Sequence, residues 1–181
     1  TNDVFSDMQV SWYPDWNKLL FISDRGNNII SKPNKDILSV FATDFNNQDI
    51  YSIDATNHIS RYTNTSYNES YANISPDGSK IIFISDESGI SNIYITEDKF
   101  LTSKNLTNVL TGITQVSWST NNEVIFTGFY KGGYDIFILS DISGKLIKIN
   151  DIINSKWREE TKNEFLKEVK INNINNNSSS L

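Results

Sequence analysis

Few residues in this chain of 181 could carry out chemistry. His58 is the only histidine and there is no cysteine, so disulfides and thiolate chemistry are excluded. His58 lies in Asp54–His58, which we expect to be a solvated loop, and no Gly-x-Ser-x-Gly segment supplies a serine nucleophile. No group of histidines and carboxylates has the spacing of a transition-metal site. We therefore predict a non-enzymatic chain with no catalytic residue, no metal and no cofactor.

Six aspartates recur at fixed places beside short apolar segments and raise the question of a calcium site. They are Asp15, Asp24, Asp44, Asp77, Asp86 and Asp135. Calcium prefers carboxylate ligands, but turns need side-chain-to-backbone hydrogen bonds at the same positions. We favour the turn role, with calcium binding or a carboxylate-lined channel as the alternative.

A second set of candidate residues could contact a partner protein. Phe129 and Tyr130 adjoin Lys131-Gly132-Gly133 in a predicted hairpin, and two aromatic side chains at a hairpin tip are costly to expose without a neighbour. Packing on an adjacent sheet is the alternative. The candidate partner contacts are Phe129, Tyr130, Lys131 and Arg25. Trp12 and Trp118, by contrast, are expected to fill the core.

The composition narrows the class of partner. The net charge of −6 and the isoelectric point near 4.7 argue against nucleic acid and against an anionic membrane surface, because both require clustered lysine and arginine. No apolar run approaches the roughly 20 residues that a membrane-spanning helix needs. With 38% hydrophobic residues the chain is expected to fold rather than remain disordered.

The segment 71–96 is the best-formed structural unit and organises the rest. Ser75-Pro76-Asp77-Gly78 has the composition of a tight turn, because proline presets φ and glycine accepts a positive φ. A short β-branched run, residues 80–85, reads as a buried strand. A polar hairpin at 86–89 and a further strand at 92–96 complete a strand–turn–strand–hairpin–strand unit.

This unit repeats along the chain. Tyr51, Tyr94 and Phe137 are spaced 43 residues apart, and entrance segments recur at 10–15, 72–77 and 116–119. A fourth short strand is predicted at 61–63, 101–107 and 148–150. A period in the low forties with four strands per unit is typical of a β-propeller blade.

Three segments depart from the repeat. Residues 26–47 are predicted to be an insertion in the first unit, because Pro33 cannot lie in a central strand; fusion of two partial units is the alternative. Residues 151–170 are predicted to form an amphipathic helix with Trp157, Phe165 and Val169 on one face, docked on the chain's own blades. The asparagine- and serine-rich tail, residues 171–181, is expected to be disordered.

The repeat resembles a known family. Ser75-Pro76-Asp77-Gly78 through Phe83, followed by Gly89 through Tyr94, is similar to the WD40-like (PD40) repeats of the TolB β-propeller. The resemblance covers roughly residues 8–150. It implies an all-β fold of three four-stranded antiparallel blades, spanning residues 1–150, and then the C-terminal helix. Three blades make an incomplete propeller, so further blades are expected from the same full-length chain or from an assembly partner.

The resemblance implies a binding function. The expected role is a non-catalytic scaffold for a protein or peptide partner, without membrane insertion, in the periplasm or envelope of a bacterium; a cytoplasmic setting is the alternative. The alternative function is the non-catalytic propeller portion of a prolyl-oligopeptidase-type peptidase whose catalytic domain lies outside this chain.

Overall fold

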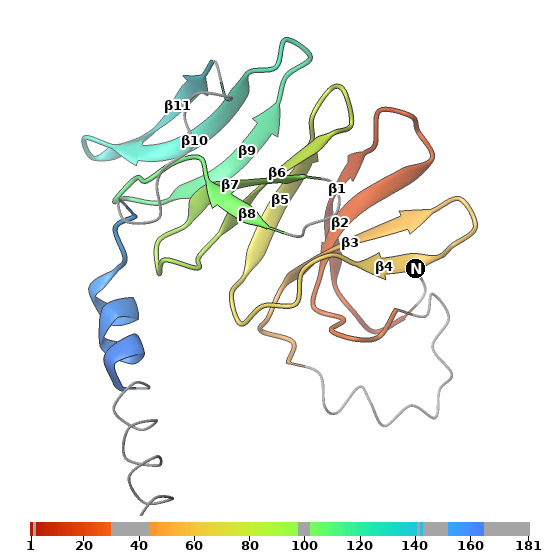
Figure 1. The fold of residues 1–181 in the computed structure, drawn as a ribbon, viewed down its shortest axis with the longest axis horizontal. Helices are drawn as coiled ribbons and strands as arrows, with labels where there is room; N and C mark the ends of the chain where they lie inside the picture. Colours follow the sequence, from red (N-terminus) through yellow and green to blue (C-terminus); the bar gives the residue numbers. More distant parts are fainter. Residues whose placement is uncertain (2, 30–43, 98–101, 141, 143–151, 165–181) are drawn as a thin grey trace, which may run out of the picture.

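The chain folds into three antiparallel sheets that stand side by side like the blades of a fan (Figure 1). The computed structural model describes residues 1, 3–29, 44–97, 102–140, 142 and 152–164. The first sheet contains β1 (Asp7–Trp12), β2 (Lys18–Ser23), β3 (Asp49–Asp54) and β4 (Ile59–Arg61). The second contains β5 (Glu69–Ile74), β6 (Lys80–Ser85), β7 (Asn92–Glu97) and β8 (Ser103–Asn105). The third contains β9 (Ile113–Trp118), β10 (Val124–Tyr130) and β11 (Gly133–Leu139).

The all-β fold and the blade-like sheets predicted from the repeat are confirmed. Strands in the first two sheets follow one another in chain order, as the repeat requires. In the third sheet β9, β10 and β11 are described, and the predicted strand at 148–150 lies outside the described residues, as do Phe165, Val169 and the tail 171–181.

The innermost strands β1 and β5 share an irregular backbone. Each has a register shift at the same place, and Gln9 and Tyr71 adopt positive φ angles of 54° and 51° there. Such bulges add twist to a strand. The first and second blades therefore share this backbone feature as well as the sequence pattern.

Two apolar layers hold the blades together. Leu20, Ile22 and Ile50 of the first blade pack with Ile81 and Phe83 of the second. The opposite face of the second blade packs on the third, through a cluster whose buried members include Ile82, Ile84, Ile93, Ile95, Val116 and Val124. A blade between two neighbours is thus apolar on both faces, which explains the near-continuous hydrophobic runs of β6 and β7.

The turn after each inner strand keeps one conformation in spite of sequence changes. Trp16, Gly78 and Asn122 close these turns with φ angles of 61°, 74° and 61°, and each donates its backbone N–H to the carbonyl three residues earlier. Trp16 adopts the left-handed conformation that glycine adopts in the best-formed blade.

The β2–β3 ladder flanks the predicted insertion. Ser23 pairs with Asp49 at the end of this ladder, and residues 30–43 of the predicted insertion lie outside the described residues. Pro33 lies outside the described residues. Trp12, expected in the core, is 53% exposed and contacts Trp16, because no described element covers that side of the first blade.

Candidate functional site

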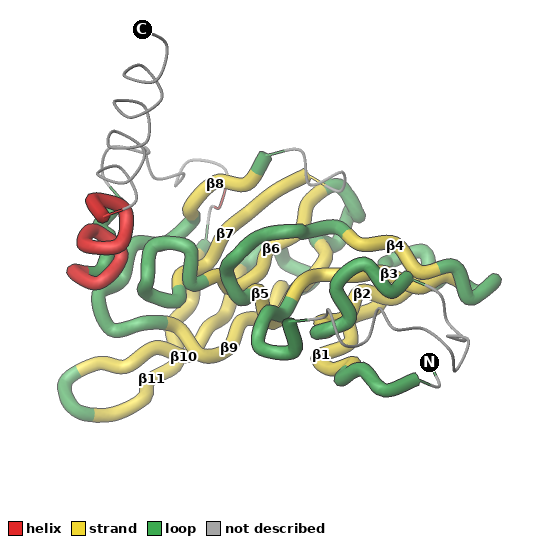
Figure 2. Tube along the Cα trace, turned by 90° about the horizontal axis from the view of Figure 1, so that it is seen from below, coloured by secondary structure: helices red, strands yellow, loops and turns green. Residues whose placement is uncertain are grey.

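A concave site lies where the C-terminal segment crosses the second blade. The backbone N–H of Ser155 donates to the carbonyl of Ser88 at 2.8 Å, and that of Ile153 donates to the Asn108 side chain at 3.1 Å. A helix over residues 156–164 follows, and the Ser155 hydroxyl caps it by accepting the N–H of Arg158. Figure 1 shows this helix below the second blade, and Figure 2 shows it, in red, at the same end of the molecule as the β10–β11 hairpin.

Gly89 permits this close approach. Its φ of +77° suits glycine, and a Cβ placed there would overlap the Ser155 hydroxyl and lie 3.2 Å from the Arg158 Cβ. The hairpin residue therefore has two reasons to be glycine, its backbone conformation and the contact with the start of the helix.

The helix docks by a different face from the one predicted. Arg158 lies with its guanidinium carbon 4.4 Å from the centre of the Tyr67 ring, a cation–π contact. Trp157, predicted to dock, is 66% exposed. The prediction was wrong for Trp157, because the backbone contacts at Ser155 turn Arg158 toward the blade.

Between this helix and β8 lies an open cleft of about 800 Å³. Its charged lining residues are three cations, Lys104, Arg158 and Lys162, and one anion, Glu87. The remaining lining residues are Ser66, Tyr67, Ser88, Tyr94, Ser103, Asn105, Ile152, Asn154 and Thr161. In a chain of net charge −6, a cleft with this excess of cations favours an anionic ligand.

Three polar residues of the cleft lining are buried: Ser88, Tyr94 and Asn105. Asn105 is 4% exposed, and its side-chain N–H₂ group is buried without a hydrogen-bond partner. Burial raises the pKa of Tyr94 to about 12, so its hydroxyl keeps its proton. The Asn105 N–H₂ group could donate hydrogen bonds to an acceptor such as a carboxylate.

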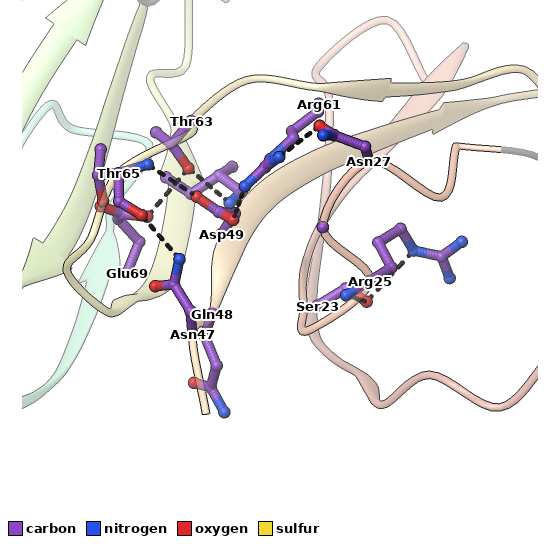
Figure 3. Close-up of polar contacts among 12 residues, drawn as sticks. Ser23, Arg25, Asn27, Asn47, Gln48, Asp49, Arg61, Thr63, Thr65 and Glu69 are labelled. Carbon is purple, nitrogen blue, oxygen red and sulfur yellow. Dashed lines mark hydrogen bonds and ion pairs between the residues drawn. The ribbon is translucent and has the colours of Figure 1, made fainter. Parts of the chain in front are cut away.

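A buried polar cluster lies at the junction of the first and second blades (Figure 3). Arg61 pairs with Asp49 at 2.5 Å, and Glu69 accepts hydrogen bonds from the hydroxyls of Thr63 and Thr65 at 3.0 and 2.7 Å. Burial raises the pKa of Glu69 to about 8, so its carboxyl is largely protonated at neutral pH. The cluster fixes the chain between β4 and β5.

The acid of this cluster recurs in the first blade but not in the third. Asp7 and Glu69 occupy the same register in the first and second blades, opposite Ser23 and Ser85, and Ile113 occupies the corresponding place opposite Gly128 in the third. We treat the cluster as support for the fold rather than as a binding site, because its acids, Asp49 and Glu69, bond to Arg61 and to the threonines within it.

Arg25, a candidate partner contact, is fully buried. Its guanidinium contacts Asp7 at 2.6 Å and Asp3 at 3.2 Å, and lies within 6 Å of the rings of Phe21 and Tyr51. Burial and the hydrogen bonds from Arg25 act in opposite directions on Asp7, and the net effect is a lowered pKa. In this structure Arg25 offers no surface to a partner, because these contacts use its donors internally.

The other three candidate contacts lie together on the β10–β11 hairpin. Phe129 and Tyr130 are 40% and 51% exposed, and the Lys131 ammonium lies 5.0 Å from the centre of the Tyr130 ring. Lys131 and Gly132 have φ angles of 47° and 92°, as a two-residue hairpin turn requires. Arg25 lies in the first blade and the hairpin in the third, so the structure does not bring the four residues together (Figure 1).

The remaining candidates serve local structure. The His58 backbone N–H donates to the Asp54 carboxylate at 3.0 Å, and its side chain is exposed. Five of the six recurring aspartates accept a backbone N–H: Asp15, Asp24, Asp44, Asp77 and Asp86. Asp135 instead lies in β11, opposite Gly128. The described residues contain no group of three or more acidic or histidine side chains placed to hold a metal ion.

Solved structures resemble this fold, although no protein-family model and no curated protein matches the chain. TolB from Acinetobacter baumannii is 24% identical over 80% of this chain and 30% of its own, with a TM-score of 0.55. The putative TolB from Agrobacterium tumefaciens is 17% identical over 81% of this chain and 50% of its own, with a TM-score of 0.62. The β-propeller domain of the trilobed protease from Pyrococcus furiosus is 17% identical over 81% of this chain and 42% of that chain, with a TM-score of 0.51.

These likenesses define the class of protein by its fold. The chain consists of β-propeller blades similar to those of TolB and of a peptidase propeller, and it spans half or less of the length of each of these proteins. Among the residues described, no helix has the length and apolar character needed to cross a membrane.

Proposed function

We propose that these blades belong to a non-catalytic β-propeller scaffold that binds a protein or peptide partner in the bacterial envelope. The observation that carries the proposal is the cleft beside β8, which gathers Lys104, Arg158 and Lys162 on an otherwise acidic chain. A peptide segment with aspartate or glutamate side chains would match both its charge and its buried donors. The exposed Phe129–Tyr130 hairpin supplies a second, apolar contact surface.

The setting in the envelope rests on the likeness to the two TolB structures. The alternative function, the non-catalytic propeller portion of a peptidase, rests on the likeness to the trilobed-protease propeller. A hydrolase domain with a serine nucleophile elsewhere in the full gene product would favour the peptidase. A secretory signal with further blades and no such domain would favour the scaffold.

A peptide-selection experiment tests the cleft. Twelve-residue peptides displayed on phage are selected on the wild-type chain, and enriched sequences are synthesised with a fluorescent label for titration. We expect acidic peptides whose affinity falls roughly three- to tenfold in Lys162→Glu, because one screened ion pair becomes a repulsion.

Lys156→Glu is the matched control. Lys156 lies on the same helix as Lys162, but its side chain is 92% exposed and it does not line the cleft. Lys156→Glu therefore changes the net charge of the protein by the same amount as Lys162→Glu without changing the cleft. Enrichment without acidic bias, or equal weakening by both reversals, would contradict binding at the cleft.

A further inference from the structure

The third blade carries an apolar face that no described element covers. Three isoleucines lie on it, exposed by 36%, 76% and 63%: Ile125, Ile136 and Ile138. The residues 43 positions earlier, in the second blade, are also isoleucines: Ile82, Ile93 and Ile95. Their side chains are exposed by only 0%, 0% and 8%. The second-blade residues are buried because the third blade packs on them. The third blade therefore presents the same face without its neighbour.

The opposite end of the array carries the face that would receive it. Val10 and Trp12 on β1 are 68% and 53% exposed. Their counterparts on β5, Ala72 and Ile74, are 1% and 8% exposed, because they pack against the first blade. Since β1 and β5 share the same bulge, the backbone that presents Val10 and Trp12 already has the shape of a receiving strand.

We propose that a second copy of this chain fills both vacant places, with the third blade of each copy packing on the first blade of the other. The contact repeats an interface that the chain already forms twice internally, between its first and second blades and between its second and third. A head-to-tail contact closes when the rotation is right. Two copies of three blades give a ring of about six, within the usual four to eight.

The match in length supports closure at two copies. The chain aligns with 50% of the putative TolB chain from Agrobacterium tumefaciens, 42% of the trilobed-protease chain and 30% of TolB from Acinetobacter baumannii. Two copies therefore supply the span of the first of these chains. Two copies of net charge −6 repel each other. The side chains that would meet at the contact are apolar, so the contact itself brings no like charges together. Several exposed apolar side chains are buried at each of the two contacts, and this burial is the driving force.

The mass of the 181-residue chain in solution tests the proposal. We expect sedimentation to give twice 20.6 kDa at micromolar concentration. Ile136→Asp and Trp12→Asp should each weaken the dimer by at least about tenfold. Leu110→Asp, at a 65%-exposed leucine between β8 and β9, should leave it unchanged. Far-UV circular dichroism confirms that each variant keeps its strands.

Mixing the two face variants tests the head-to-tail geometry. Each variant alone has lost both contacts, whereas a mixed pair retains one intact contact between the wild-type Ile136 of one chain and the wild-type Trp12 of the other. We expect a mixed dimer to form. A wild-type chain that stays monomeric, as it would if further blades of a longer polypeptide covered both faces, overturns the proposal. A Trp12→Asp chain that still dimerises also overturns it, because the contact would then join two like faces.

Discussion

Single buried residues in the blades respond to pH according to what surrounds them. Glu69 lies in the register position that Asp7 occupies in the first blade, but Asp7 has Arg25 beside it and Glu69 has two threonine hydroxyls. Burial raises the pKa of Glu69 to about 8 in spite of the two threonine hydrogen bonds, whereas the hydrogen bonds to Asp7, with Arg25 foremost, outweigh its burial and lower its pKa. One position thus holds a charged carboxylate in one blade and a neutral acid in the next.

Glu69 should make the protein less stable as the pH rises. The pKa of Glu69 is about 8 in the folded chain and 4.5 ordinarily. Between pH 4.5 and pH 8 the folded state therefore keeps the proton on Glu69, whereas the unfolded state has released it. The free energy of unfolding then falls across this range, by on the order of a few kcal/mol in total. Thermal denaturation at pH 5 and pH 8.5 measures the loss. Glu69→Gln should flatten it, and equal slopes in both proteins would contradict the assignment.

Phe83 should be among the most costly side chains to truncate. It is 3% exposed, stacks on Tyr94 with ring centres 5.8 Å apart, and lies in the layer between the first two blades. We expect Phe83→Ala to lower the free energy of unfolding by about 3–5 kcal/mol in urea denaturation. Trp157→Ala, at an aromatic residue that is 66% exposed, should change it by less than about 0.5 kcal/mol. A loss below about 1 kcal/mol for Phe83→Ala would mean that its ring is not in the core.

At the scale of elements, the docking of the C-terminal helix depends on Gly89. Gly89→Ala places a Cβ against Ser155 and forces the start of the helix away from the blade. We expect proteolysis within residues 156–164 to accelerate and the cleft to open, because the displaced residues carry the Ser155–Ser88 hydrogen bond and the Arg158–Tyr67 contact.

Gly78→Ala is the control for Gly89→Ala. Gly78 has a φ of +74°, close to the +77° of Gly89, but its nearest neighbours to a new Cβ are 3.9 Å away. Both variants carry the same backbone strain, so only the contact with the helix differs. Equal cleavage rates in the two variants would show that backbone strain, and not the contact with Ser155, explains the effect.

The strands could be predicted from the sequence, whereas the cleft could not. Residues 80–85 form β6 as predicted, because a β-branched run between two turns has few other conformations. The cleft depends on Ser88 and Gly89 meeting Ser155 and Arg158, more than 60 residues later in the chain. No local pattern encodes that contact. The sequence pattern predicts Gly89 to be a hairpin residue, and its φ of +77° agrees. The pattern does not predict that Gly89 also contacts Ser155.

The helix shows why the direction of docking was mispredicted. Apolar periodicity identifies the face of a helix that avoids water, and by that criterion Trp157 should dock. Backbone hydrogen bonds at Ser155 and the Arg158–Tyr67 contact fix the rotation of the described turns instead. Neither signal is visible as periodicity. In the same way Trp12 was assigned to the core from its repeat position, which predicts burial only if a blade precedes it.

At the scale of the whole molecule, the three blades should differ in how readily they open. The second blade is covered on both faces, so Ile81 and Ile82, which point to opposite sides of β6, are both fully buried. In the third blade Ile136 and Ile138 are exposed, and β10 is the only partner of β11 among the described strands. The free energy of local opening should therefore be highest at β6 and lowest at β11.

Hydrogen exchange of the chain at a concentration where it is monomeric would measure this gradient. We expect amides of β6 and β7 to exchange only through global unfolding, and those of β11 to exchange at least about tenfold faster. The prediction concerns the uncovered face, so raising the concentration until dimers form should slow exchange in β11 and leave β6 unchanged. Equal exchange rates in the three blades of the monomer would contradict the predicted gradient. The third blade, whose face with Ile136 is exposed, would then be as resistant to local opening as the second blade, whose two faces are covered.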